Sequence, residues 1–265
     1  MWWQNYWPQA NIFTVGPIAV HWYGLILAFG LLAAGFYSYY QLRKKQILIA
    51  SQFEDLIFYL VIFSLLGARI GHVFFTWYYY QDHLADILKV WQGGLSWWGG
   101  FLAGVCVLIW WAKKHQMNFF AIADIVAPAA ALGQAIGRWG NYFNQELYGR
   151  PTNGWWGIAI APQHRLSGYE RYDYFQPTFF YEFILNLLLF FALNKFLQFA
   201  KIKTGLVTWL YLAGYALIRF SLEFIRIDDT PTWWFLRAPQ VISLLVFILA
   251  IFSIIGLRHK PLSKS

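Results

Sequence analysis

The chain is poor in charged residues and has almost no cysteine. Charged residues make up 12% of its 265 residues and hydrophobic residues 59%, a balance that excludes a disordered chain and an ordinary water-soluble domain. The single cysteine, Cys106, excludes a disulfide within the chain. It lies in an apolar run, so we expect a small buried residue. No lysine or arginine precedes the first apolar stretch, which argues against a cleavable signal peptide.

The sequence contains no spacing of metal ligands, no nucleotide-binding loop and no internal repeat, so we expect neither a metal nor a cofactor. Two glycine pairs, Gly93-Gly94 and Gly99-Gly100, flank a short apolar stretch. They match no phosphate-binding loop and follow no strand. We interpret both pairs as small residues that allow helices to approach closely.

Seven apolar segments have about the length, roughly 17 to 25 residues, that a helix needs to cross the hydrocarbon core of a membrane. They lack the alternating pattern of barrel strands, so helices are the expected spanning elements. The segments lie near residues 18–39, 56–77, 95–111, 119–136, 178–196, 205–224 and 241–257. The sequence therefore predicts an all-α membrane protein, a bundle of seven transmembrane helices that forms one membrane domain over residues 1–265.

Basic residues predict the orientation of this bundle. Most lysines follow the first, third, fifth and seventh segments, in the group Arg43, Lys44, Lys45, Lys113, Lys114, Lys195, Lys201, Lys203, Arg258, Lys260 and Lys264. Short basic loops stay in the cytoplasm, so we expect the N-terminus outside and the C-terminus inside. These lysines lie next to anionic headgroups and account for much of the net charge of +8. Nucleic acid is therefore not an expected partner.

The other arginines fall on the outer side of the predicted bundle or in the outer half of a span. They are Arg69, Arg138, Arg150, Arg165, Arg171, Arg219, Arg226 and Arg237. A guanidinium group can hold a phosphate or carboxylate through two parallel hydrogen bonds, which an ammonium group cannot. This segregation of lysine and arginine predicts an anion site that faces the outer leaflet.

Further polar residues fall at the same depth of the predicted bundle, namely His21, Tyr23, His72, Ser96, Trp98, Tyr181 and Glu182. Tyr215, Arg219, Glu223 and Arg226 share one face of the sixth helix, and a polar face within a membrane is expected to line the bundle interior or a wet cavity. The alternative for this face is a ladder of ion pairs that only holds helices together. For Arg69 and His72, which lie three residues apart on one helix face, the alternative is likewise a structural pair that only stabilises the fold.

Residues 141–176 are too polar to span a membrane and too many for a tight turn, so we expect a small periplasmic head over the mouth of the cavity. Just before and within this segment runs Gly-Arg-Trp-Gly-Asn-Tyr-Phe-Asn-Gln-Glu-Leu-Tyr-Gly-Arg-Pro-Thr, from Gly137 to Thr152. Fixed charges beside a membrane are costly and usually serve a function.

This run resembles the signature of the bacterial prolipoprotein diacylglyceryl transferases. The likeness extends to His21-Trp22-Tyr23-Gly24, to Gly67-Ala68-Arg69, to Pro177-Thr178 with Tyr181-Glu182, and to Arg219-Phe220 with Glu223 and Arg226. The resemblance implies a multi-pass enzyme of the bacterial inner membrane, surrounded by membrane lipids. It also implies transfer of the diacylglyceryl group of phosphatidylglycerol to the thiol of the signal-peptide cysteine of a prolipoprotein, with release of glycerol phosphate.

The resemblance also implies roles for single residues. Arg138 holds the phosphatidylglycerol headgroup, Asn141, Glu146 and Gly149 shape the same site, and Arg219 is the second essential cation. Glu223 and Arg226 support Arg219, and Tyr23 faces the pocket. Tyr215 and Arg69 join the substrate-binding set because of their depth. Alternatively, Arg138 is a helix-end arginine bonded to terminal carbonyls, and Asn141 and Gly149 only form turns.

One departure from the family pattern concerns the general base. Many members carry a histidine in the stretch Gly-Gly-x-Ser-x-His-Gly-Gly, where this chain has Trp98. An indole ring cannot accept the thiol proton. The candidate replacements are His72, His21 and Glu146, of which we favour His72. Two competing hypotheses remain: a carrier or binding protein for an anionic phospholipid, and a catalytically inactive relative that binds lipid.

Overall fold

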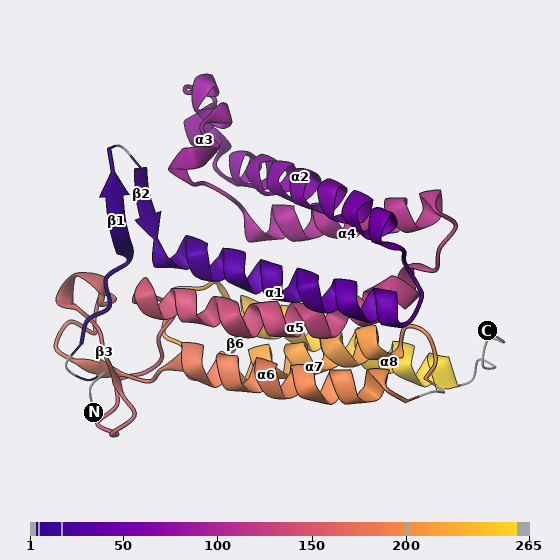
Figure 1. Ribbon diagram of the computed structural model, residues 1–265. Coiled ribbons are helices and arrows are strands. Elements are labelled where there is room, and N and C mark those ends of the chain that lie inside the picture. The colour runs from indigo at the N-terminus through magenta and orange to yellow at the C-terminus, as the bar shows by residue number, and fades with distance from the viewer. Residues whose placement is uncertain (1–3, 5, 17, 200–201, 259–265) are drawn as a thin grey trace. The chain divides into compact units, whose positions relative to one another are not determined.

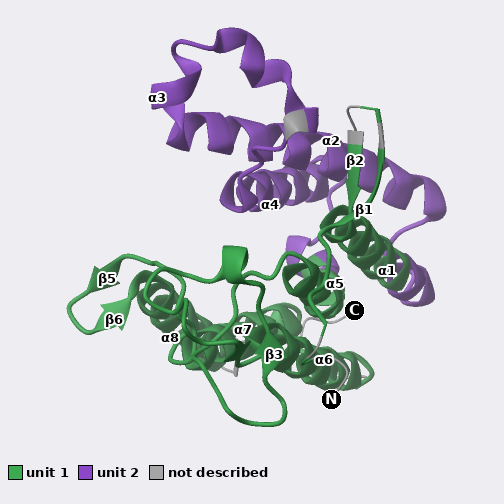
Figure 2. Cartoon of the chain, turned by 90° about the vertical axis from the view of Figure 1, so that its left-hand side faces the viewer, with its two compact units in different colours: residues 1–38, 123–265 green, residues 39–122 purple. Residues whose placement is uncertain are grey.

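The computed structural model describes residues 4, 6–16, 18–199 and 202–258. Lys201, Lys260 and Lys264, on which part of the predicted orientation rests, lie outside the described residues. The chain forms two compact units, shown in different colours in Figure 2. Unit 1 comprises residues 1–38 and 123–265, and unit 2 comprises residues 39–122.

The described residues are mostly helical (Figure 1). Each predicted segment overlaps one of the long helices: α1 (Trp22–Lys44), α2 (Ala50–Phe75), α4 (Trp97–Lys114), α5 (Phe119–Phe143), α6 (Thr178–Leu197), α7 (Leu206–Leu222) and α8 (Ala238–Arg258). Among the described residues, five helices are long and apolar enough to cross a membrane: α1, α2, α5, α6 and α8. Helix α7 is apolar but shorter, and α4 is rich in tryptophan and glycine, which have low hydropathy. A helical protein with several candidate spans is confirmed, and the number seven stays a prediction.

Two boundaries differ from the sequence prediction in ways that affect the site. Residues Ile18–His21 form strand β2, which pairs with strand β1 (Asn11–Val15) in an antiparallel hairpin. The prediction that His21 begins the first span is therefore wrong, because the helix starts only at Trp22, whose amide donates to Ala10 in the chain before β1. Helix α5 continues to Phe143, so Arg138 lies inside this helix and does not end it.

In unit 1, helix α7 contacts both α6 and α8. The carboxylate of Asp124 in α5 fixes the start of α7, because it accepts hydrogen bonds from the Gly205 amide at 2.6 Å and from the Thr208 amide at 2.8 Å. The Thr208 hydroxyl donates to the same carboxylate at 2.6 Å. This arrangement satisfies amides that the first turn of a helix otherwise leaves unpaired.

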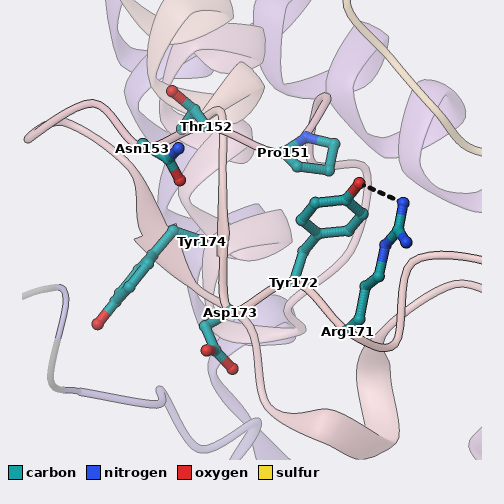
Figure 3. A pocket seen from close by; sticks show the side chains of 7 residues that line it. All are labelled: Pro151, Thr152, Asn153, Arg171, Tyr172, Asp173 and Tyr174. Carbon is teal, nitrogen blue, oxygen red and sulfur yellow. Dashed lines mark hydrogen bonds between the residues drawn. The ribbon is translucent and has the colours of Figure 1, made fainter.

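The segment between α5 and α6 folds around a small aromatic core. Strands β3 (Ile158–Ala159) and β4 (Tyr174–Phe175) pair antiparallel. Their buried core comprises Tyr142, Tyr148, Ile158, Ile160, Phe175 and Phe179. Next to β4 a hollow is lined by Pro151, Thr152, Asn153, Arg171, Tyr172, Asp173 and Tyr174, shown in Figure 3. There Arg171 lies over the Tyr172 ring and donates to its hydroxyl at 2.8 Å.

In unit 2, helices α2 and α4 contact each other closely. A Cβ added at Gly99 or Gly100 would meet the backbone of α2, so the interpretation of this pair as close helix packing is confirmed. It is wrong for Gly93 and Gly94, which adopt φ of 89° and 73° in the connection before α4. That conformation favours glycine.

The expectation that Cys106 is buried is also wrong, because the residue is exposed on α4. An apolar run predicts burial only for a helix that protein covers on all sides. A helix of a membrane protein can instead present such a face to lipid.

Candidate active site

The predicted outer arginines of α5 and α7 meet in unit 1 around two buried carboxylates. We call this group the arginine cluster, and its members are Arg138, Glu182, Tyr215, Arg219, Glu223, Arg226, Asp228 and Arg237. Four arginines and three carboxylates leave an excess of one positive charge. Because charge within a membrane protein is expensive, such a group indicates a functional site.

Arg138 connects α5 with α6. Its Nε lies 3.1 Å from an oxygen of Glu182, which is 3% exposed. Its Nη1 donates to Asn141 Oδ1 at 3.2 Å, and Asn141 Nδ2 donates to Glu146 Oε1 at 2.7 Å. Arg138 therefore bonds side chains, which differs from the alternative of a helix-end arginine bonded to carbonyls. The three residues form a chain that runs from the buried cluster to the exposed Glu146.

Glu223 lies at the centre of the cluster and is 1% exposed. Arg219 approaches one of its oxygens at 2.7 Å and Arg237 approaches the other at 3.2 Å, while Arg226 lies 3.9 Å away. The ion-pair ladder proposed from helical spacing is therefore present. A buried carboxylate requires such partners, since an unpaired charge would be costly there.

Tyr215 joins the two halves of the cluster. It shares a side-chain hydrogen bond with Arg138 and interacts electrostatically with Glu182, Arg219 and Arg226. Its position on α7, four residues before Arg219, puts both side chains on the same helix face. Tyr215 therefore lies close to Arg219 and Arg226, and its membership of a substrate site stays a prediction.

The ion pairs leave hydrogen-bonding capacity unused. Among the described residues, buried Arg219 Nη1 and both Glu223 oxygens have no hydrogen bond of good geometry, although Arg219 and Glu223 are in ionic contact. Glu182 Oε1 also has no hydrogen bond of good geometry, although it is in ionic contact with Arg138. Arg219 Nη1 is also the atom in contact with Glu223, but a guanidinium group carries five N–H donors, so Arg219 can hold Glu223 and donate to a phosphate oxygen as well.

Arg237 is a member of the cluster that the motif did not single out. It ends strand β6 (Leu236–Arg237), which pairs with β5 (Thr232–Trp233), and it lies directly before α8. Its guanidinium donates to Arg226 O at 2.8 Å and to Thr230 Oγ1 at 2.7 Å, and also to the carbonyl of Asp228. The only sequence signal was its place among the outer arginines.

Asp228 follows α7 and completes the charge pattern. Arg226 Nε donates to its carboxylate at 2.7 Å. Burial raises the pKa of Asp228, but the hydrogen bond from Arg226 and the charges of Arg226 and Arg237 outweigh it, so the pKa lies below its usual value. Asp228 therefore remains a carboxylate and holds Arg226 in place.

Gly149 brings the head segment against the end of α7. It forms an antiparallel bridge with Arg226. A Cβ at this position would lie 2.8 Å from the Ile225 side chain and 2.9 Å from that of Thr178. Asn141 lies in helix α5. The alternative in which Asn141 and Gly149 only form turns is thus not observed for either residue.

Tyr23 lies at the start of α1 and crosses α5 at Gly140, where an added Cβ would lie 2.7 Å from the tyrosine ring. Its hydroxyl interacts electrostatically with Arg138, and its side chain is partly exposed, at 38% for the residue. This geometry is compatible with the predicted role of Tyr23 at the pocket wall.

Arg69 and His72 belong to unit 2, on α2. The Arg69 guanidinium donates to Ile87 O and Gly93 O, both at 2.8 Å, to Gly94 O at 3.0 Å and to the Asp86 carbonyl. It also lies 5.3 Å over the Tyr80 ring, which His72 meets edge-on. Arg69 thus binds the connection between α2 and α4, which agrees with the structural interpretation for Arg69 alone and leaves the role of His72 a prediction.

Comparisons with known proteins agree with the motif. The prolipoprotein diacylglyceryl transferase family matches residues 10–256 of the chain. The chain belongs to this family. It is 36% identical over 255 residues to the phosphatidylglycerol–prolipoprotein diacylglyceryl transferase of Synechocystis sp., which covers 94% of this chain and 89% of that protein. The relatives of the same name from Trichormus variabilis and Fervidobacterium nodosum are each 37% identical, over 96% and 89% of this chain and 92% and 81% of their own lengths.

The chain is therefore a transferase of this family, and its arginine cluster contains Arg138, Arg219 and Arg226, three of the arginines that the resemblance singled out. Glu182, Asp228 and Arg237 complete that set with the counter-charges and the additional cation. Among the described residues, no group of three His, Cys, Asp or Glu side chains is placed to hold a metal ion.

Proposed function

We propose that this transferase moves the diacylglyceryl group of phosphatidylglycerol to the signal-peptide cysteine of a prolipoprotein, the first step of lipoprotein maturation. The observation that carries the proposal is the buried Glu223 surrounded by Arg219, Arg226 and Arg237, with Arg138 beside Tyr215. The excess of one positive charge matches a phosphodiester, which carries one negative charge. Family membership supports the same reaction.

The reaction is a displacement at carbon. The cysteine sulfur attacks the glycerol carbon that carries the phosphate, so a carbon–sulfur bond forms while the carbon–oxygen bond breaks. The electron pair of the broken bond leaves with glycerol phosphate, and the thiol proton passes to a base. Arg138 and Arg219 stabilise the charge that develops on the departing phosphate, since fixed guanidinium groups in a water-poor site need no reorganisation.

Neighbouring residues, both inside and outside the arginine cluster, position Arg138 and Arg219. Asn141 and Glu146 hold Arg138, and Glu223 holds Arg219 together with Arg226. Gly149 allows the head segment to approach Arg226, while Tyr23 and Tyr215 offer hydroxyl groups beside Arg138. The guanidinium of Arg69 donates to four backbone carbonyls, so we propose that it holds the connection between α2 and α4 within unit 2 and does not contact substrate.

We propose His72 as the base that accepts the thiol proton, because this chain has Trp98 at the family histidine position. His72 is half-buried beside the Tyr80 ring. We expect His72→Gln to lower turnover far more than His164→Gln, a change at an exposed histidine of the head. Equal and mild effects of the two changes would remove His72 from the mechanism and leave Glu146 and His21 as candidates.

We further propose seven spans in a bacterial inner membrane, with the N-terminus outside and the C-terminus inside. The basic residues at the ends of α1 and α4 support this orientation. Labelling of single cysteines by a membrane-impermeant reagent, in a Cys106→Ser background, tests it. A cysteine at Gln163 should react in intact spheroplasts, and one at Gln46 should react only after lysis. The reverse pattern would contradict the orientation.

The activity is tested with purified protein, phosphatidylglycerol and a peptide that carries a signal-peptide cysteine. Release of glycerol phosphate together with a thioether product is expected. Arg219→Gln should abolish both, whereas Arg171→Gln, which changes an arginine outside the arginine cluster, should leave them intact. Tight binding of phosphatidylglycerol without any product would favour a carrier or an inactive relative.

A further inference from the structure

A second polar hollow opens beside the arginine cluster, between the head segment and the loop that follows α7. Its volume is about 280 Å³, and the residues that line it include Arg150, Tyr169, Arg226, Asp229, Thr230 and Arg237. We call it the outer hollow. The displacement mechanism does not require it, although Arg150 belongs to the Gly137–Thr152 run and Arg226 to the arginine cluster. It has the size of a small polar molecule, and its wall carries three arginines and two aspartates, Asp228 and Asp229.

The outer hollow is continuous with the arginine cluster. Arg226 and Arg237 line the hollow, and both also contact the buried Glu223. The hollow and the cluster therefore share two guanidinium groups, and the carboxylate of Asp228 lies within ion-pair distance of both.

Arg150 adds a cation that the cluster does not use. Its amide donates to Ile225 O at 3.0 Å and its carbonyl accepts from the Gln176 amide, so its backbone is fixed between two segments. Its side chain is exposed, and among the described residues no carboxylate lies within ion-pair distance of it. Arg226 and Arg237, in contrast, each have a carboxylate partner.

We infer that the outer hollow binds the glycerol phosphate released by the transfer, before this product reaches water. The inference rests on the proposed function. Cleavage converts a phosphodiester with one charge into a phosphate monoester with about two at neutral pH. The second charge favours the additional arginine at the rim of the hollow. The hydroxyl groups of the glycerol can donate to the exposed Asp229 and exchange hydrogen bonds with Thr230.

Product inhibition tests this assignment with the full-length protein. The inhibition constant of glycerol phosphate is measured for wild type, Arg150→Gln and Arg171→Gln, together with the KM for phosphatidylglycerol. Loss of one partly exposed charge-assisted contact should weaken inhibition about fivefold in Arg150→Gln. The KM for phosphatidylglycerol should change much less. Arg171→Gln removes an equally exposed arginine of the head and should match wild type in both quantities.

An inhibition constant unchanged by Arg150→Gln would overturn the inference. A parallel rise of the KM would also overturn it, since the hollow would then hold the headgroup of the donor lipid. Calorimetric titration of the wild type with glycerol phosphate, inorganic phosphate and sulfate gives a second measurement that needs no variant. Glycerol phosphate should bind most tightly, and equal affinity for all three anions would contradict a product site. Failure of the wild type to form a thioether would count against the proposed function instead.

Discussion

Glu223→Gln is the most informative change to the arginine cluster. The substitution keeps the size of the side chain but removes the charge that lies 2.7 Å from Arg219 and 3.2 Å from Arg237. Because Glu223 is 1% exposed, water cannot replace the lost partner. Breaking a buried ion pair on one side costs about 3 to 5 kcal/mol, so we expect the free energy of unfolding to fall by about that amount.

The same change should also reduce catalysis. Arg219 loses the group that orients it, and a displacement of about 1 Å at such a position can cost roughly a hundredfold in rate. Thermal unfolding in detergent and the turnover of phosphatidylglycerol measure the two effects. Asp173→Asn is the matched control, because Asp173 pairs with Arg165 and is itself exposed to water. A Glu223→Gln protein with wild-type stability and turnover would refute the idea that Glu223 organises the site. A lower KM with full turnover would show that Glu223 only offsets charge.

Three further predictions concern packing, capping and pH. Gly149→Ala should lower stability by about 1 to 3 kcal/mol and reduce activity because its Cβ meets neighbouring side chains, whereas Gly137→Ala, with open space around the Cβ, should be tolerated in the same thermal assay. Asp124→Ala should cost about 3 kcal/mol of unfolding free energy, since it removes three hydrogen bonds at the start of α7, and Asp124→Asn should cost less. Because its pKa is lowered in the folded protein, Asp228 stabilises the fold above its unfolded pKa of about 4, and this contribution is lost as the pH falls through the folded pKa. Asp228→Asn should therefore flatten the loss of stability below about pH 4 in an acid titration.

The long helices were predictable because composition and length determine them. Hydrophobic runs of sufficient length leave few alternatives in a membrane, so each predicted segment meets a helix. Their ends were less predictable. Ile18–His21 is as apolar as the helix that follows, and only its pairing with Asn11–Val15 makes it a strand. Helix α5 continues to Phe143 because the polar side chains of Arg138 and Asn141 find partners on other segments.

Half of the arginine cluster follows from local spacing. Helical spacing predicted that Tyr215, Arg219, Glu223 and Arg226 lie close together. The prediction of one shared helix face is correct only in part, because α7 ends at Leu222 and Arg226 lies beyond the helix. Arg237 could not be placed in this way, since it reaches Glu223 from a hairpin whose position depends on tertiary contacts. Glu182 was predicted at the right depth, but its pairing with Arg138 depends on how α5 and α6 are rotated.

The charge balance of the site connects binding with release. Four arginines and three carboxylates leave one positive charge in the cluster. A phosphodiester neutralises this charge, so the bound headgroup can remain in a water-poor environment. Cleavage of the carbon–oxygen bond adds a negative charge to the phosphate, and the buried cluster has no further cation to match it. The outer hollow adds one further arginine, Arg150. The same imbalance that retains the substrate therefore favours movement of the product outward, and Arg150→Gln should weaken the binding of the product with little change in the binding of the substrate.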